Sequence, residues 1–222
     1  GTGAPPRENQ TIVVRDGRIA ALGDAASIQQ PAGAQIIDLT GKTVIPGLVM
    51  MHEHLYYPSG SDTYSNLSES FTRLYLACGV TSMRTACNST GYGEINIANE
   101  IRRGEKPGPW IDATAPYLTG PGLDITQFYE LRDAADATRV TSFWADAGAT
   151  SFKAYMTITR AELAAAIKEA HRRGLKITGH LCSVTYGEAS AMGIDNLEHS
   201  FAVATDFVKG KQPDQCPPQS ET

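Results

Sequence analysis

The chain has 222 residues, and its 21 glycines and 12 prolines are typical of a globular protein rich in loops. Basic residues number 19 against 24 acidic ones, so the formal net charge is −5 and a nucleic acid is not an expected partner. The sequence has no run of about 18 apolar residues and therefore predicts no membrane span. Since it does not begin with Met, the compartment, cytoplasmic or exported, is left open.

The cysteines give little structural information at this point. They are too few and too widely spaced for a disulfide framework or a zinc knuckle, so we expect buried or incidental thiols. The four residues are Cys78, Cys87, Cys182 and Cys216.

Residues 1–42 are predicted to be rich in β-structure. Residues 11–23 indicate a hairpin, because the Asp16-Gly17 dipeptide lies between two short apolar runs. A further strand is expected at residues 35–39. We interpret this opening as a small sheet that precedes the main domain.

From residue 43 to about residue 206, apolar runs alternate with helical segments. This alternation predicts a parallel sheet with helical crossovers. Two folds are open: a flavodoxin-like open sheet, or a (β/α)8 barrel represented by about six of its units. Residues 207–222 have no periodic pattern and are predicted to be a loop or a disordered tail. The predicted strands lie near 44–54, 80–86, 110–118, 150–156, 176–181 and 196–200, and the predicted helices at 68–78, 95–103, 133–147, 159–173 and 186–192.

Four of the five histidines fall at the ends of predicted strands. His52 and His54 are two residues apart, and alternate residues of a strand share a face, so both rings can reach one ion while Glu53 points away. His180 and His199 end two later strands, where barrel and other α/β enzymes place their chemistry. Because neutral imidazole suits zinc and similar divalent metals, the pattern predicts a metal site.

Lys153 lies in the middle of the apolar strand predicted at 150–156. A buried lysine is unfavourable unless it is paired or discharged. Two interpretations are open: a lysine that extends its amine to water, or a lysine with a lowered pKa that carries or contacts an anionic group.

Taken together, these motifs resemble the amidohydrolase superfamily, in its prolidase-like and imidazolonepropionase-like branch. The hairpin Asp16-Gly17-Arg18-Ile19 also resembles the family's leading β-sandwich, and the resemblance extends to about Asp206. The matching segments are KTVIPGLVMMHEH at 42–54, then Lys153, Gly179-His180 and Leu197-Glu198-His199.

The resemblance implies an incomplete (β/α)8 barrel at 43–206, preceded at 1–42 by part of a β-sandwich. It implies that His52 and His54 bind the more buried metal. Lys153 would react with carbon dioxide to give a carbamate that bridges two metals, and His180 and His199 would bind the second. One or two divalent ions, zinc before others, and carbon dioxide are therefore the expected cofactors.

The family's catalytic aspartate, on the eighth barrel strand, has no match up to Thr222. The 23 residues after His199 are too few for two more strand–helix units. The chain is therefore expected to be truncated at both ends or to be one part of a longer protein. The catalytic residue stays unidentified.

The implied activity is hydrolysis of an amide-type C–N bond by a metal-bound hydroxide. Dipeptides, N-acyl amino acids and small cyclic amides are the expected substrates, and self-association into a homo-oligomer is left open. Arg84 is a candidate to meet a substrate carboxylate, with a structural ion pair as the alternative, and Tyr186 is a candidate to aid an oxyanion, with simple packing as the alternative. Two other functions stay open: a non-catalytic metal-binding fragment or pseudoenzyme, and a cyclic imide hydrolase or deaminase.

Overall fold

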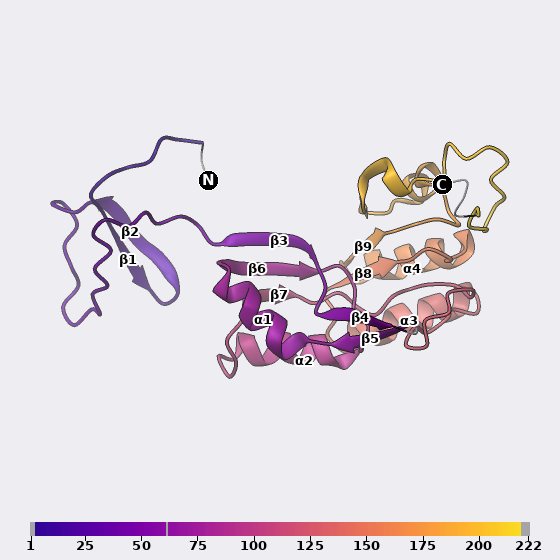
Figure 1. Ribbon diagram of the computed structural model, residues 1–222, viewed down its shortest axis with the longest axis horizontal. Coiled ribbons are helices and arrows are strands. Elements are labelled where there is room, and N and C mark those ends of the chain that lie inside the picture. Colours follow the sequence, from indigo (N-terminus) through magenta and orange to yellow (C-terminus); the bar gives the residue numbers. More distant parts are fainter. Residues whose placement is uncertain (1–2, 61, 219–222) are drawn as a thin grey trace. The chain divides into compact units, whose positions relative to one another are not determined.

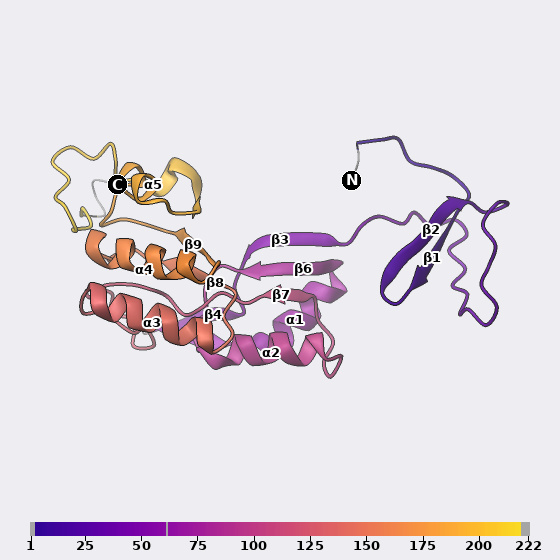
Figure 2. The same ribbon diagram turned by 180° about the vertical axis from the view of Figure 1, so that it is seen from behind.

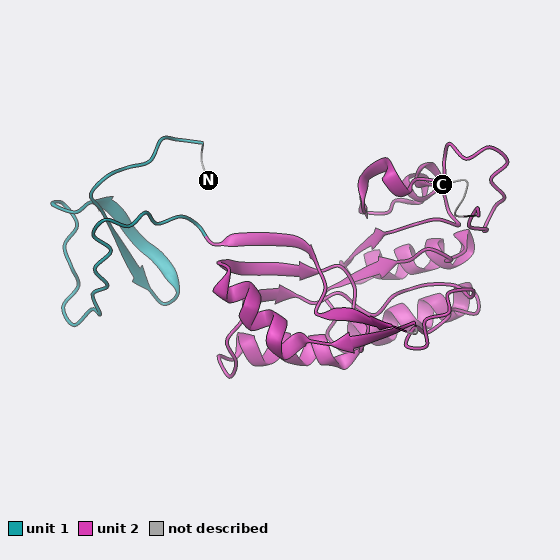
Figure 3. Ribbon diagram, viewed as in Figure 1, with its two compact units in different colours: residues 1–46 teal, residues 47–222 magenta. Residues whose placement is uncertain are grey.

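A computed structural model describes residues 3–60 and 62–218 of the chain (Figure 1). The chain divides into two compact units, residues 1–46 and residues 47–222 (Figure 3). Within the described residues, none of the helices is both long and apolar enough to cross a membrane.

The first unit contains the predicted hairpin, formed by the antiparallel strands β1 (Gln10–Arg15) and β2 (Arg18–Asp24). Asp16 and Gly17 have φ of 52° and 70°, as a tight hairpin turn requires. The strand expected at residues 35–39 is wrong, because Ile36 and Ile37 are 67% and 70% exposed and the segment is irregular. An apolar run becomes a strand only where a backbone partner is available. Because β1 and β2 pair only with each other among the described strands, residues 35–39 are not part of their sheet.

The second unit is built on six parallel strands, at the six places that the sequence predicts. Hydrogen bonds join β3, β6 and β7 in one sheet and β8, β9 and β10 in another. Isolated bridges from Thr114 to Ser151 and from Leu118 to Ala154 connect the two sheets. The strands are β3 (Leu48–Glu53), β6 (Val80–Thr85), β7 (Trp110–Asp112), β8 (Ser151–Ala154), β9 (Lys176–Gly179) and β10 (Asn196–Leu197).

The spatial order of these strands follows their order in the chain. A flavodoxin-like sheet would reverse direction at a switch point, whereas a barrel is wound in one direction only. The observed order excludes the flavodoxin-like alternative and is typical of a (β/α) barrel. Accordingly, the carboxyl ends of all six strands lie at one edge, which is where the predicted site residues occur.

Five helices follow the predicted pattern. Helix α1 packs against β6, α2 against β7, and α4 against β8 and β9 (Figures 1 and 2). Capping boxes begin α4 at Thr159 and α5 at Thr185, which explains why their first residues are clear from the sequence. The helices are α1 (Ser68–Ala77), α2 (Tyr92–Arg102), α3 (Ala134–Asp146), α4 (Arg160–Arg172) and α5 (Tyr186–Met192), followed by the 3₁₀ helix η1 (Ser200–Val203).

The core of this unit lies between the strands and the helices, and strand β8 is buried along its whole length. Phe152 packs in the apolar core. Because neighbouring residues of a strand point to opposite faces, Lys153 lies on the other face of the sheet. The site residues described below occupy that second face.

A second hairpin follows β3 and was not predicted. It consists of β4 (Tyr56–Gly60) and β5 (Thr63–Asn66), and the Gln127 side chain hydrogen-bonds to the backbone N–H and C=O of Tyr64. Pro58 interrupts the pattern of strand-forming residues in β4, because proline cannot donate to a ladder. The hairpin begins two residues after His54 and so borders the site.

We expected all four cysteines to be thiols, and this expectation is wrong for two of them. Cys182 and Cys216 form a disulfide with a Cα–Cα distance of 5.0 Å, while Cys78 and Cys87 are free. Only the fold brings the bonded pair together, since 34 positions separate them in sequence. Residues 207–218 of the predicted tail form turns, and residues 219–222 of that tail lie outside the described residues.

Candidate functional site

The four histidines predicted from strand ends lie side by side in one row. The ring centroids are 5.3 Å apart from His54 to His52, 4.7 Å from His52 to His199, and 4.5 Å from His199 to His180. His52 lies in β3, His54 and His180 come directly after β3 and β9, and His199 follows β10 by two residues. The carboxyl ends of three strands that are distant in sequence thus place four imidazoles together.

The neighbouring Glu53 takes the other direction, as the alternation predicts. Its carboxylate accepts a hydrogen bond from the Tyr75 hydroxyl of α1. The helix side of β3 therefore carries Glu53, and the opposite side carries the histidines.

The backbone is strained where it presents His199. His199 and Ser200 have φ of 66° and 62°, in the left-handed region that residues other than glycine rarely adopt. Two such residues in succession turn the chain from β10 into η1. Strain of this kind is typical of functional sites, where the geometry of one side chain matters more than local stability.

Lys153 does not reach water, which rules out the first of the two interpretations given above. It is 1% exposed, and its Nζ lies 3.6 Å from Glu198 Oε1. Burial lowers the pKa of Lys153 to about 8, and the carboxylate of Glu198 acts against this shift. The lysine therefore has a substantial neutral fraction near pH 8 and a carboxylate as its neighbour.

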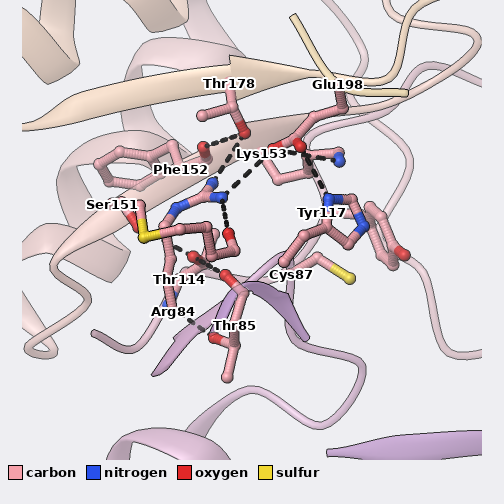
Figure 4. A network of polar contacts seen from close by, with 12 residues as sticks. Arg84, Thr85, Cys87, Thr114, Tyr117, Ser151, Phe152, Lys153, Thr178 and Glu198 are labelled. Atoms are coloured by element: carbon pink, nitrogen blue, oxygen red, sulfur yellow. Dashed lines mark hydrogen bonds and ion pairs between the residues drawn. The ribbon is translucent and has the colours of Figure 1, made fainter. Parts of the chain in front are cut away.

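Glu198 is the centre of a charged network that the sequence did not reveal (Figure 4). The side chain is 6% exposed; its Oε2 lies 2.7 Å from His52 Nδ1, and its Oε1 accepts from Arg84 Nη1 at 3.2 Å. Burial acts to raise the pKa of Glu198, but the hydrogen bond with His52 and the charge of Lys153 hold it below its usual range. The available signal was a glutamate beside a strand-end histidine.

Arg84 is the anchor of this network. Its Nη2 donates to Thr178 Oγ1 at 2.9 Å and its Nη1 to the Met51 carbonyl at 3.2 Å, besides the contact with Glu198. Its predicted contact with a substrate carboxylate stays a prediction. Tyr186, the other predicted substrate residue, is buried and donates its hydroxyl hydrogen bond to the Glu198 carbonyl.

A second, uncharged network lies beside His54. Cys87 Sγ lies 3.5 Å from His54 Nδ1 and 2.7 Å from the Tyr56 hydroxyl, which is 2.6 Å from the Tyr117 hydroxyl. Burial raises the pKa of the Cys87 thiol well above its usual value. Burial, followed by the charges of His52 and Lys153, lowers the pKa of His54 to about 4, so that its ring is neutral.

His180 is neutral for similar reasons. Burial, followed by the charge of His199, lowers its pKa to about 4, and burial also lowers the pKa of His199. Neutral imidazole is the form that binds divalent metals.

The residues fit a metal site in their chemistry and in their proximity. In the part of the chain that the structure describes, however, no group of three or more His, Cys, Asp or Glu side chains has its donor atoms arranged to hold an ion. His52 directs Nδ1 to Glu198, which leaves Nε2 as its donor atom for an ion, and Lys153 carries an amine, which becomes a metal-binding anion only as a carbamate. Imidazoles together with such an anion form a donor set suited to zinc.

Comparison with known sequences gives several short matches. No protein-family model matches the chain. It is 43% identical over 61 residues to an imidazolonepropionase of Geobacillus sp. (strain WCH70), 40% over 85 residues to an enamidase of Eubacterium barkeri, and 38% over 98 residues to a deacetylase of Agrobacterium fabrum. These matches cover 25%, 37% and 44% of this chain, but only 14%, 21% and 21% of the relatives.

Comparison with solved structures shows the fold over most of the chain. A provisionally named prolidase from Bifidobacterium longum matches with a TM-score of 0.68 and 24% identity, over 85% of this chain and 48% of its own. A Xaa-Pro dipeptidase with bound methionine matches with a TM-score of 0.64 and 19% identity, over 86% of this chain and 56% of its own. The chain thus spans about half the length of these structures.

Proposed function

We propose that the chain is a member of the amidohydrolase superfamily and forms the metal-binding part of a hydrolase that cleaves amide-type C–N bonds. The observation that carries the proposal is the row of four histidines beside a buried lysine, at the carboxyl ends of parallel strands in chain order. The same order supports an incomplete (β/α)8 barrel at residues 43–206, and the hairpin of β1 and β2 supports residues 1–42 as part of a β-sandwich.

Five side chains would hold one or two divalent cations, zinc before others: His52, His54, His180, His199 and, as a carbamate, Lys153. When bound, such cations lower the pKa of a water molecule and polarise the carbonyl of an amide. The chain itself supplies neutral imidazoles and a lysine with a lowered pKa. A neutral amine is the form that adds to carbon dioxide, giving a carbamate and releasing a proton.

The proposed substrates are dipeptides, N-acyl amino acids and small cyclic amides. The names of the relatives support this range, since they include an enamidase, a deacetylase and a Xaa-Pro dipeptidase. The residue that passes the proton to the leaving amine is not assigned among residues 3–60 and 62–218. An aspartate on a later barrel strand is the proposed candidate.

The test compares the natural protein that contains this chain with its Lys153→Met variant. Metal content is measured by elemental analysis, and turnover is measured on a panel of dipeptides, N-acyl amino acids and lactams. We expect the variant to lose metal and to lose more than about 100-fold in activity, which is the upper end of the effect of residues that only support ligands. Lys168→Met, at an exposed position of α4, is the matched control and should change neither quantity.

Two outcomes would contradict the proposal. A wild-type protein that binds metal but turns over nothing on the panel would favour the pseudoenzyme. Mass spectrometry of products that showed ammonia loss without ring or chain cleavage would favour a deaminase.

A further inference from the structure

We propose that Glu198 is a positioning residue of this site: held by Arg84, its carboxylate fixes the ring of His52 so that Nε2 is the atom presented to the cation. This inference rests on the proposed function. It assigns a role to a residue outside the five proposed ligands, and it explains why Arg84 is turned toward Glu198 in the structure (Figure 4).

The first step is the direction of the hydrogen bond between Glu198 and His52. An ionised carboxylate can only accept hydrogen bonds, so the ring nitrogen 2.7 Å from Glu198 Oε2, His52 Nδ1, carries the proton. In a neutral imidazole the lone pair then belongs to Nε2. A partner of this kind fixes both the tautomer and the orientation of a metal-binding histidine.

The second step is the position of the carboxylate itself. Glu198 follows β10 by one residue, and its partners come from three other strands: His52 from β3, Arg84 from β6 and Lys153 from β8. A buried carboxylate without partners would be strongly unfavourable. Its contacts across the sheet therefore hold the oxygen near His52 in one place.

The third step concerns charge. As an amine, Lys153 contributes a positive charge 3.6 Å from Glu198, but as a carbamate it would contribute a negative one. Arg84 would then be the permanent side-chain cation in direct contact with Glu198, because guanidinium does not deprotonate in proteins. Its further hydrogen bonds, to Thr178 and to the Met51 carbonyl, keep it in place whatever the state of Lys153.

The main test is the Glu198→Gln variant of the natural protein, which keeps the shape of the side chain and removes its charge. Metal affinity is measured by competition with a chromophoric chelator, and the site geometry by the visible absorption of the cobalt-substituted protein. We expect a ~10–100-fold loss of affinity and a changed cobalt spectrum. Glu105→Gln, at an exposed position, is the matched control and should leave both unchanged.

A double-mutant cycle separates positioning from a general structural effect. In a His52→Ala background, Glu198→Gln should cause no further loss of metal affinity, because the proposed effect passes through the His52 ring. An undiminished loss in that background would contradict the proposal.

Arg84→Met distinguishes positioning from direct substrate binding. Positioning predicts weaker metal binding and a lower kcat, with KM changed equally for substrates with and without a carboxylate. Unchanged metal affinity together with a higher KM for carboxylate substrates alone would overturn our proposal and support the contact predicted from the sequence.

A measurement on the wild type does not depend on how the variants fold. NMR spectra of the ring nitrogens in the metal-free protein should show His52 protonated at Nδ1, and protonation at Nε2 alone would refute the inference. If the wild type bound no cation at all, the proposed function would fail instead, and the tautomer of His52 would still decide this proposal.

Discussion

Two buried polar clusters support the two histidines of the first barrel strand, and they do so in opposite ways. The charged cluster consists of Arg84, Lys153 and Glu198 beside His52, and the neutral cluster of Tyr56, Cys87 and Tyr117 beside His54. In the charged cluster each charge has an opposite partner. In the neutral cluster, burial keeps the thiol and the phenols protonated.

Two glutamates make the contrast clear. Glu198 lies beside the cations Arg84 and Lys153 and is ionised, because the hydrogen bond with His52 and the charge of Lys153 outweigh the effect of burial on its pKa. Glu94 of α2 is 1% exposed, and its Oε2 has no hydrogen-bond partner among the described residues. Burial raises the pKa of Glu94 to about 8, although a hydrogen bond with Thr85 acts against the shift. The surroundings, more than the residue type, thus decide whether a buried carboxyl is charged.

The largest effect is expected from removing one partner of the charged cluster. Arg84→Ala should lower the unfolding free energy of the metal-free protein by about 3–5 kcal/mol, because Glu198 would lose its permanent cation. Chemical denaturation measures this change. The double variant Arg84→Ala/Glu198→Ala should recover part of the loss, and Arg103→Ala, in an exposed pair with Glu105, should leave the unfolding free energy nearly unchanged. A double variant less stable than Arg84→Ala would contradict charge pairing as the cause.

A smaller, pH-dependent effect is expected from Glu94→Gln. The pKa of Glu94 in the folded state, about 8, lies above its ordinary value of 4.5, so the folded protein retains a proton that the unfolded chain releases. This contribution to stability is fully present below pH 4.5 and is lost as the pH rises through 8. Relative to the wild type, the variant should gain up to about 4 kcal/mol between pH 5 and pH 9, since nearly all of the interval from 4.5 to about 8 falls in this range and one pKa unit is worth about 1.4 kcal/mol.

Urea unfolding at pH 5, 7 and 9 measures this difference. Glu105→Gln, on the surface, is the control and should follow the wild type closely. Parallel stability curves for the Glu94 variant and the wild type would show that Glu94 is ionised in the folded protein.

The smallest effect is expected from the neutral cluster. Tyr117→Phe removes the hydrogen bonds of the Tyr117 hydroxyl with Tyr56 and Cys87 and should cost about 1 kcal/mol of stability. Because no charge is lost, metal affinity should fall far less than the 10–100-fold expected for Glu198→Gln. Tyr57→Phe, at an exposed position, is the matched control for both measurements. Equal losses of metal affinity from Tyr117→Phe and Glu198→Gln would remove the distinction between the clusters.

Local sequence patterns were sufficient to predict the main elements. The apolar runs that become the six parallel strands are short-range signals, and they placed the four histidines at or near strand ends and Lys153 inside a strand. The flavodoxin-like alternative stayed open because the spatial order of the strands depends on how distant segments pair, and no local sequence pattern specifies it.

What could not be predicted depends on contacts between distant residues. Glu198 is 146 residues from His52, and its role follows only from the position of β10 relative to β3. The hairpin β4–β5 contains a proline that weakens its pattern, and residues 35–39 have an apolar pattern without a backbone partner. In each of these examples, pairing decided the structure and local propensity did not.

The bond between Cys182 and Cys216 closes a covalent ring in the chain that contains α5, β10 and the last proposed ligand, His199. A protease that cut once between these cysteines would leave His199 covalently attached to the rest of the molecule. On a denaturing gel the nicked protein would migrate as one species until a reductant separated it into two. The protein can therefore keep His199 attached even when its backbone is cut between the two cysteines.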